Sequence, residues 1–378
     1  GTAQRPVAML ASPADARSPA GWSQLHIGGT SVSEADHLWL VGGGIGATFD
    51  RIQGGSASEP VLRVDAGAEV TMRGGGMVDC PGKGFFVDGG RLTLQGAVIS
   101  RTDTGGESFA GILKVSDSHV LEIPEGAASV SDTKNDGFKV RGVHPSGVGS
   151  VIERSVMMII HEDGIDHDGA DLAVRDVWIE GMQEMGLSVS GNDRSVVSVE
   201  GSVFRRSYVG VEVGYGKPQL TITDTLSADN YYGVRHGDKY SDRTQLGVLT
   251  ARNTLVMDNA KQNVRVDAAS RKAGQINLAC SIPTTYLESV DTSRSKPAIV
   301  IDEGTGNCEV HVAASKPHSC NGDPAPLGPQ TLCRYIPSRE GVGEREAVLV
   351  VDVVSTTPTQ SSSSTTTSSG GTRSAAPV

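Results

Sequence analysis

A short pattern of small and apolar residues returns at regular intervals along most of the chain. It begins with a small residue, most often Gly, continues with an apolar and then a variable residue, and often ends with Val, as in Gly137–Val140 and Gly186–Val189. Its nine copies begin at residues 61, 84, 112, 137, 164, 186, 210, 233 and 263, so they lie 22 to 30 residues apart. Repeats of this length are typical of solenoids, in which each repeat packs only against its neighbours.

A second run of alternating apolar residues follows the first within each repeat, about ten to fifteen residues later. Leu92–Leu94, Leu172–Val174 and Leu220–Ile222 are examples. Alternation with a period of two predicts strands that have one buried face. Two or three short strands per repeat, with Gly and Asn/Asp turns between them, predict an all-β fold built as a parallel β-solenoid of about nine to ten coils.

The ends of such a solenoid expose unpaired strand edges that have to be covered. We expect residues 1–35 to form an N-terminal cap, residues 36–318 the parallel β-helix, and residues 319–354 a Cys-containing C-terminal cap. Residues 355–378 are rich in Ser and Thr and are predicted to be a disordered tail, because they cannot bury a core. A tail of this composition suits an O-glycosylated stalk or a plain flexible extension.

Composition excludes several other classes of protein. Only 4% of the residues are aromatic while 48 are Gly, which argues against a helical bundle or a coiled coil. The formal net charge of −11 argues against non-specific nucleic-acid binding. No run of 18 apolar residues occurs, so no membrane span is predicted. The oligomeric state stays open.

The cysteines are unevenly placed. Cys80 stands alone, whereas Cys280, Cys308, Cys320 and Cys333 crowd the last quarter of the chain. Two local disulfides, Cys280–Cys308 and Cys320–Cys333, are the simplest pairing and imply an oxidising compartment. Five free thiols in a cytosolic protein are the alternative. Together with the Ser/Thr-rich tail, the disulfide interpretation predicts a secreted or cell-surface protein.

The third position of the repeated pattern is predicted to face outward, because the apolar second position faces the interior. Along the chain this third position forms a charged stripe of Lys114, Lys139, Asp166, Ser188, Glu212, Arg235 and Arg265. One interpretation is a solvated face with ion pairs between neighbouring coils, Lys139 with Asp166 and Glu212 with Arg235. The other is a groove for a long charged polymer, since a solenoid offers an extended binding surface.

Carboxylates are densest around residue 166, where Glu162, Asp163, Asp166, Asp168 and Asp171 fall close together. Like charges at this density cost stability unless a Ca²⁺ ion or a shared proton neutralises them. Asp166, Asp168 and Asp171 have a spacing that suits Ca²⁺, and they are the predicted metal ligands. Solvated turn carboxylates are the alternative.

Two histidines, His167 and His236, stand where other copies of the pattern have Val, at a position expected to face inward. Each is either a buried histidine with a hydrogen-bond partner or a catalytic base beside the groove. Tyr side chains on such a face stack on sugar rings, and Lys or Arg neutralises acidic groups; ordinary loop residues are the alternative. The candidate substrate-binding residues are Lys139, Tyr208, Glu212, Tyr232 and Lys239.

Four short motifs occur in order in four of the repeats: Asn135-Asp136-Gly137, Glu162-Asp163-Gly164, Glu184–Ser188 and Gly233–Gly237. Over about residues 36–318 the repeats resemble the right-handed parallel β-helix of the pectate-lyase-like superfamily. The four motifs resemble those of the polygalacturonases, which are inverting hydrolases on this fold. That resemblance implies catalytic roles for Asp136, Glu162, Asp163 and Arg235, while Met185 and Gly237 stand where the family has His and Lys.

A second resemblance carries no mechanism. Asp163–Asp166 and Gly210–Gly214 are similar to repeats of surface β-helix proteins of unassigned activity. The alternatives to an enzyme are therefore a non-catalytic surface or adhesion module and a trimeric glycan-binding spike.

The leading hypothesis is an enzyme that cleaves an acidic polysaccharide in a groove along the β-helix. In a lyase, His236 or Tyr232 would take the proton next to the substrate carboxyl, which Lys139, Arg235 or Lys239 would neutralise. In a hydrolase, acid and base would come from the carboxylates. The complete set of candidate catalytic residues is Asp136, Glu162, Asp163, Asp166, His167, Arg235 and His236.

Overall fold

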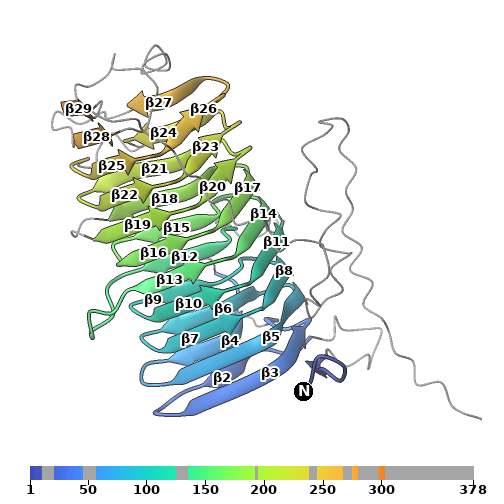
Figure 1. The fold of residues 1–378 in the computed structure, drawn as a ribbon. Coiled ribbons are helices and arrows are strands. Elements are labelled where there is room, and N and C mark those ends of the chain that lie inside the picture. The colour runs from blue at the N-terminus through green and yellow to red at the C-terminus, as the bar shows by residue number, and fades with distance from the viewer. Residues whose placement is uncertain are drawn as a thin grey trace, which may run out of the picture. The chain divides into compact units, whose positions relative to one another are not determined.

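The computed structural model of the protein describes residues 1–10, 21–45, 57–124, 135–191, 195–237, 245–266, 275–279 and 298–302. Every regular element in these ranges is a β-strand, and the strands pair in parallel to form two long sheets (Figure 1). No helix within them has the length and apolar character of a membrane span. The predicted all-β class and parallel strands are confirmed, and the arrangement is compatible with a β-solenoid.

One sheet gains a single strand with each repeat, and it has ten strands in the described ranges. In order they are β2 (Leu25–Ile27), β4 (Pro60–Asp65), β6 (Lys83–Asp88), β9 (Glu107–Phe109), β12 (Phe138–Arg141), β15 (Ile165–Asp168), β18 (Met185–Gly191), β21 (Val209–Gly216), β24 (Tyr232–His236) and β27 (Gln262–Val266). Because each pairs with the next, equivalent residues of successive repeats lie side by side.

The other sheet has nineteen strands in the described ranges and begins with β1 (Val7–Met9), β3 (Val32–Val41) and the long β5 (Glu69–Cys80). Beyond β5 it divides into two columns. The first contains β7 (Arg91–Gln95), β10 (Ile112–Ser116), β13 (Ser150–Glu153), β16 (Leu172–Arg175), β19 (Val196–Glu200), β22 (Gln219–Thr223), β25 (Val248–Arg252), β28 (Gln275–Ala279) and β29 (Ala298–Asp302). The second contains β8 (Val98–Thr102), β11 (His119–Ile123), β14 (Val156–Ile160), β17 (Trp178–Met182), β20 (Val203–Arg205), β23 (Leu226–Ala228) and β26 (Leu255–Met257).

Most repeats therefore contribute three strands, one to the ten-stranded sheet and one to each column of the larger sheet. Strand pairing already begins at β1 and β2, inside the segment of residues 1–35 expected to be a cap.

Side chains of the ten-stranded sheet alternate between the interior and the opposite face. In β12, Phe138 and Val140 belong to the apolar core, and Lys139 lies between them on the other face. The core is one cluster of buried apolar side chains that reaches from Leu40 to Val266. Its alternation with outward polar residues creates a long polar face on this sheet.

One of the nine predicted copies of the pattern lies in a different sheet. Ile112–Val115 belongs to β10, where Lys114 is exposed, and Glu107 of β9 is the residue that lies next to Lys139. The assignment of Lys114 to the stripe is therefore wrong. The copy in its place reads Gly105-Gly106-Glu107-Ser108, which has no apolar residue for the pattern to detect.

Two aromatic rings replace the missing apolar side chain of Gly106. Phe85 and Phe138 occupy the equivalent position in the repeats before and after it, and their ring centroids are 5.6 Å apart. A Cβ atom on Gly106 would lie 2.3 Å from the Phe85 ring. The core is thus filled at this repeat by its neighbours.

The recurring Gly of the pattern has a steric cause. A Cβ atom on any of these glycines would lie 2.0 to 2.6 Å from a backbone carbonyl oxygen of the next repeat. They form a ladder of Gly84, Gly105, Gly137, Gly164, Gly186, Gly210 and Gly233. Only glycine allows the backbones to approach this closely.

Several predictions concern residues outside the described ranges. These are the C-terminal cap over 319–354, the tail over 355–378, Lys239, and the disulfides Cys280–Cys308 and Cys320–Cys333. Cys80 is described, and its thiol is free and buried.

Candidate functional site

The outward face of the ten-stranded sheet carries a continuous line of polar side chains, called the outer row below. Its members are neighbours in the strand register: Glu107, Lys139, Asp166, Ser188, Glu212, Arg235 and Arg265. Most of them are buried although they face away from the core. A buried charge is tolerated only when it is paired.

Ion pairs join the charges of the outer row across neighbouring repeats. Lys139 pairs with Asp166, and Glu212 pairs with Arg235, as the sequence predicted. Two residues further along the same two strands, Arg141 Nε lies 3.3 Å from Asp168 Oδ2. The cations expected to neutralise an acidic substrate, Lys139 and Arg235, therefore already have carboxylate partners.

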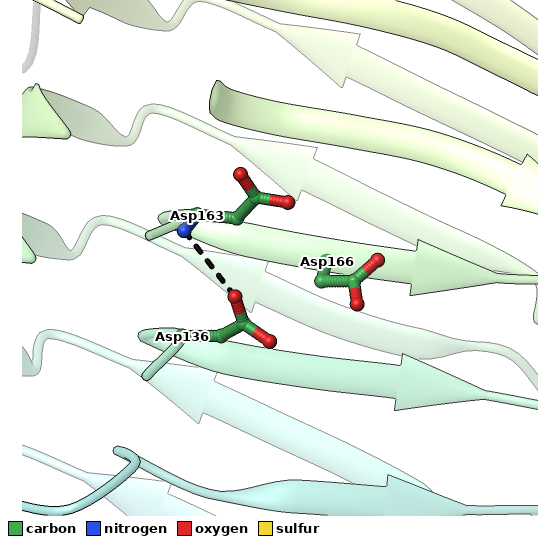
Figure 2. A group of neighbouring side chains, drawn as sticks. All are labelled: Asp136, Asp163 and Asp166. Atoms are coloured by element: carbon green, nitrogen blue, oxygen red, sulfur yellow. Dashed lines mark hydrogen bonds between the residues drawn. The ribbon is translucent and has the colours of Figure 1, made fainter. Parts of the chain in front are cut away.

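Three carboxylates from two neighbouring repeats meet beside Lys139 and form the acidic cluster: Asp136, Asp163 and Asp166 (Figure 2). One oxygen of each lies within 4.8 Å of the others. The Asp163 backbone N–H donates to Asp136 Oδ1 (3.2 Å), and the Met185 N–H donates to Asp163 Oδ1 (2.8 Å). Asp136 and Asp163 are buried, whereas the Asp166 side chain is 19% exposed.

Burial gives two of these carboxyls an unusual preference for the protonated form. It raises the pKa of Asp136 well above its ordinary value, with nearby Asp166 as the second cause. Burial likewise raises the pKa of Asp163, and Asp136 adds to the effect. Burial alone would lower the pKa of Lys139, but Asp166 and Asp136 raise it above its ordinary value. The cluster thus combines two buried carboxyls of raised pKa with a third carboxyl that contacts an ammonium group.

The raised pKa values predict that stability falls as the pH rises. A carboxyl whose folded pKa exceeds its unfolded value stabilises the fold below the unfolded pKa, and this contribution is lost as the pH rises through the folded pKa. Asparagine mimics the neutral acid, so Asp136→Asn is expected to raise the melting temperature relative to wild type more at pH 8 than at pH 5. His167 and His236 are present in both proteins, so their titration cancels in this comparison.

Thermal unfolding of both proteins at the two pH values measures the effect. The matched control is Asp36→Asn, at an exposed position, which is expected to change stability by less than about 0.5 kcal/mol at either pH. A larger loss of stability in Asp136→Asn at pH 8 than at pH 5 would show that Asp136 is held as a carboxylate.

The residues predicted to bind Ca²⁺ have other partners. Asp168 pairs with Arg141, and Asp171 Oδ1 accepts the Val196 N–H at 2.8 Å. In the described ranges, the carboxylates close enough to share one cation are Asp136, Asp163 and Asp166. Their oxygen donors suit Ca²⁺ or Mg²⁺, but a cation there would have to compete with Lys139, which already pairs with Asp166.

The two candidate histidines lie on the interior side of the sheet. His167 lies in register between Val140 and Val189, and its Nε2 contacts the carbonyl oxygen of Ala170. His236 lies between Val213 and Val266. Both are fully buried, and burial lowers the pKa of each imidazole. Neither ring is on the face that carries the acidic cluster.

The candidate tyrosines gather two to three repeats beyond the acidic cluster. Tyr232 begins β24 and is buried, whereas Tyr208, just before β21, is 42% exposed. Burial raises the pKa of Tyr232, so the phenol keeps its proton at neutral pH.

The last candidate residue, Glu162, directly precedes Asp163, and its backbone nitrogen lies 3.3 Å from the carbonyl oxygen of Asn135.

Two charged residues of this face were not singled out from the sequence. Lys83 is fully buried, and its Nζ lies 2.6 Å from Glu107 Oε2. Burial lowers the pKa of Lys83 in spite of this partner. The sequence feature that could have identified Glu107 is the Gly105-Gly106 pair before it. Gly105 belongs to the glycine ladder, but Gly106 stands where the pattern has an apolar residue. Lys83 lies just before Gly84 of the same ladder.

Comparison of the chain with known protein families, with curated proteins and with solved structures found no match to any of them. The functional assignment therefore depends on the geometry of the acidic cluster and its surroundings.

Proposed function

We propose that the protein is a carbohydrate-active enzyme that hydrolyses a glycosidic bond of a polysaccharide lying along the outer row. The observation that carries this proposal is the acidic cluster, in which the buried Asp136 and Asp163, both of raised pKa, lie within 4.8 Å of Asp166. Glycoside hydrolysis needs one carboxyl that donates a proton and one that is ionised, and environments that push their pKa values apart identify such pairs.

The roles follow from the surroundings of each carboxyl. Asp163, with Asp136 beside it, is the general acid that protonates the leaving oxygen of the glycosidic bond. Asp166, in contact with the Lys139 ammonium, is the carboxylate that stabilises or attacks the developing positive charge of the sugar. A separation below about 5.5 Å favours retention of configuration, because an inverting pair needs room for a water between the carboxyls.

The fold adds indirect support. Stacked parallel strands with one outward polar face are compatible with a right-handed parallel β-helix of the pectate-lyase-like type, and such a face offers an extended surface for a polymer. We propose in addition that the protein acts outside the cell or at its surface. The Ser/Thr-rich segment 355–378 supports this location.

A non-catalytic glycan-binding module is the second candidate, and one observation favours it. Asp136 and Asp163 each accept a backbone N–H from the next repeat and are barely exposed. In this alternative the acidic cluster joins neighbouring repeats, and the glycan binds to the outer face without being cleaved.

A panel of acidic and neutral polysaccharides tests the proposal, with each assay run in Ca²⁺ and again after chelation. Hydrolysis produces new reducing ends, independently of Ca²⁺, and its rate falls as the pH rises and the raised pKa carboxyls lose their proton. Absorbance of an unsaturated product that disappears on chelation would instead assign the cluster to Ca²⁺ and the reaction to elimination. Binding without any product would favour the non-catalytic module.

A further inference from the structure

A pair of exposed tyrosines lies along the same face as the acidic cluster. Tyr208 and Tyr231 directly precede β21 and β24, each is 42% exposed, and their rings stack with centroids 5.3 Å apart and an interplanar angle of 11°. These two residues are called the tyrosine pair. Only 4% of the residues of this chain are aromatic, yet two of them are exposed side by side. Both lie at the starts of paired strands, where backbone hydrogen bonds hold them.

A third aromatic ring, that of Tyr232, packs against both members of the tyrosine pair. Tyr232 meets Tyr208 and Tyr231 edge-on, with centroid distances of 5.5 and 4.7 Å. The guanidinium group of Arg265 lies 4.3 Å from the centre of the Tyr232 ring. Edge-to-face and cation–π contacts of this kind hold aromatic groups in fixed orientations. The tyrosine pair is therefore preorganised, which reduces the entropy lost when a ligand binds.

The apolar surface under the tyrosine pair continues the line of the acidic cluster. Met185, Val209 and Tyr232 form a small apolar cluster separate from the core, and they are neighbours in the strand register. The Met185 N–H donates to Asp163, which joins this line to the acidic cluster. At about 4.8 Å per repeat, Tyr208 and Tyr231 lie roughly 10 and 14 Å along the sheet from Asp163.

Charge on this face selects against an acidic ligand. The outward cations Lys83, Lys139, Arg141 and Arg235 pair with carboxylates. Glu162 and Glu184, which are one residue before Asp163 and Met185, lie in the direct line between the acidic cluster and Tyr208. An anionic polymer would meet these carboxylates, whereas the outer-row cations Lys139 and Arg235 already pair with carboxylates and the Arg265 guanidinium lies against the Tyr232 ring.

We propose that the tyrosine pair is a subsite for an uncharged sugar ring of the same polysaccharide chain whose bond lies at Asp163. The apolar C–H face of a pyranose stacks on an aromatic ring, and the neighbouring carboxylates accept hydrogen bonds from its hydroxyls. This inference rests on the proposed function and narrows its substrate to a neutral glycan. Because the subsite lies two to three repeats from Asp163, the enzyme cleaves within long chains and leaves disaccharides intact.

Calorimetric binding to soluble β-glucan, xylan, mannan and galactan tests the subsite, with polygalacturonate and alginate as acidic probes. Wild type is expected to bind a neutral glycan, with an affinity that salt changes little. Tyr208→Ala and Tyr231→Ala should each weaken that binding about tenfold, while Tyr208→Phe, which keeps the ring, should bind within about twofold of wild type. Val148→Ala, at an exposed position outside this face, is the control for folding and is expected to bind like wild type.

Other outcomes are separable. Binding of acidic polymers alone, no binding of any neutral probe, or unchanged binding in both alanine variants would each overturn the tyrosine subsite. Asp163→Asn distinguishes this failure from that of the proposed function, because it should slow cleavage at least about a hundredfold and keep binding. Cleavage by Asp163→Asn at the wild-type rate would overturn the hydrolase assignment. It would not affect the evidence that the tyrosine pair binds glycan.

Discussion

Hydrolysis of a bound glycan is expected to fall by a factor of about 10² to 10⁴ when Asp163 is replaced by asparagine, the range that loss of a general acid typically costs. The amide is nearly the same size as the acid and still accepts the Met185 N–H through Oδ1, so the fold should be retained. What the variant loses is the acidic proton of Asp163, whose pKa burial raises well above its ordinary value. Initial rates of reducing-end formation at saturating glycan measure the effect.

The same assay on Asp36→Asn controls for the chemical change alone, because Asp36 is exposed and belongs to a strand of the other sheet. The melting temperature of Asp36→Asn and the glycan affinities of both variants should match wild type closely, so that a fall in rate reports chemistry. A rate in Asp163→Asn within about twofold of wild type would remove Asp163 as the acid, given the 10² minimum expected.

Replacing Gly105 with alanine is expected to destabilise the fold by about 3 kcal/mol, at the upper end of the usual cost of overpacking. A Cβ atom there would lie 2.0 Å from the carbonyl oxygen of Gly137, which belongs to the backbone of the next repeat and has little freedom to move. The two repeats must separate, and that weakens the hydrogen bonds between β9 and β12. Thermal and denaturant unfolding monitored by circular dichroism measure the loss.

Gly28→Ala is the matched control. Its Cβ atom would meet only the tips of the Asp65 and His26 side chains at 3.6 Å, which is ordinary contact distance. The control is expected to change stability by less than about 0.5 kcal/mol. Equal stability of the Gly105 and Gly28 variants would mean that the repeats are not held at the close spacing of the glycine ladder.

The period-two alternation predicted the strands and their buried face well, because equivalent residues of every repeat pack in the same way. The alternation around Phe138 and Val140 gave the correct inward face, and the predicted ion pairs of Lys139 and Glu212 followed from the same alternation. The prediction failed at Lys114, where a strand of the other sheet carries an equally regular alternation. There the true copy lacks apolar residues, since Phe85 and Phe138 fill its space from the neighbouring repeats.

The candidate site was harder to predict, because it depends on turns as well as on strands. Asp166 was predicted from its strand position, and Asp136 and Asp163 from their resemblance to the polygalacturonase motifs. The strand alternation does not place the last two, because both precede their strands and the turn geometry brings them close to Asp166. The cluster of five carboxylates in the sequence suggested Ca²⁺ at Asp166, Asp168 and Asp171; in the structure Asp168 pairs with Arg141 and Asp171 accepts a backbone N–H. Sequence spacing gives proximity along the chain, whereas the site combines residues that are 27 positions apart.

The ion pairs of the outer row also distinguish the correct neighbour of each repeat from the other repeats. The backbones of the repeats are nearly interchangeable, so hydrogen bonding alone would allow a repeat to stack on the wrong neighbour, a known failure of repetitive proteins. Loss of the repeat that contains β12 would place Glu107 directly against Asp166, and like charges there would oppose the contact. The order of charges thus favours the native order of the repeats. Duplication or deletion of a repeat in this region would bring like charges together and destabilise the contact between its neighbours.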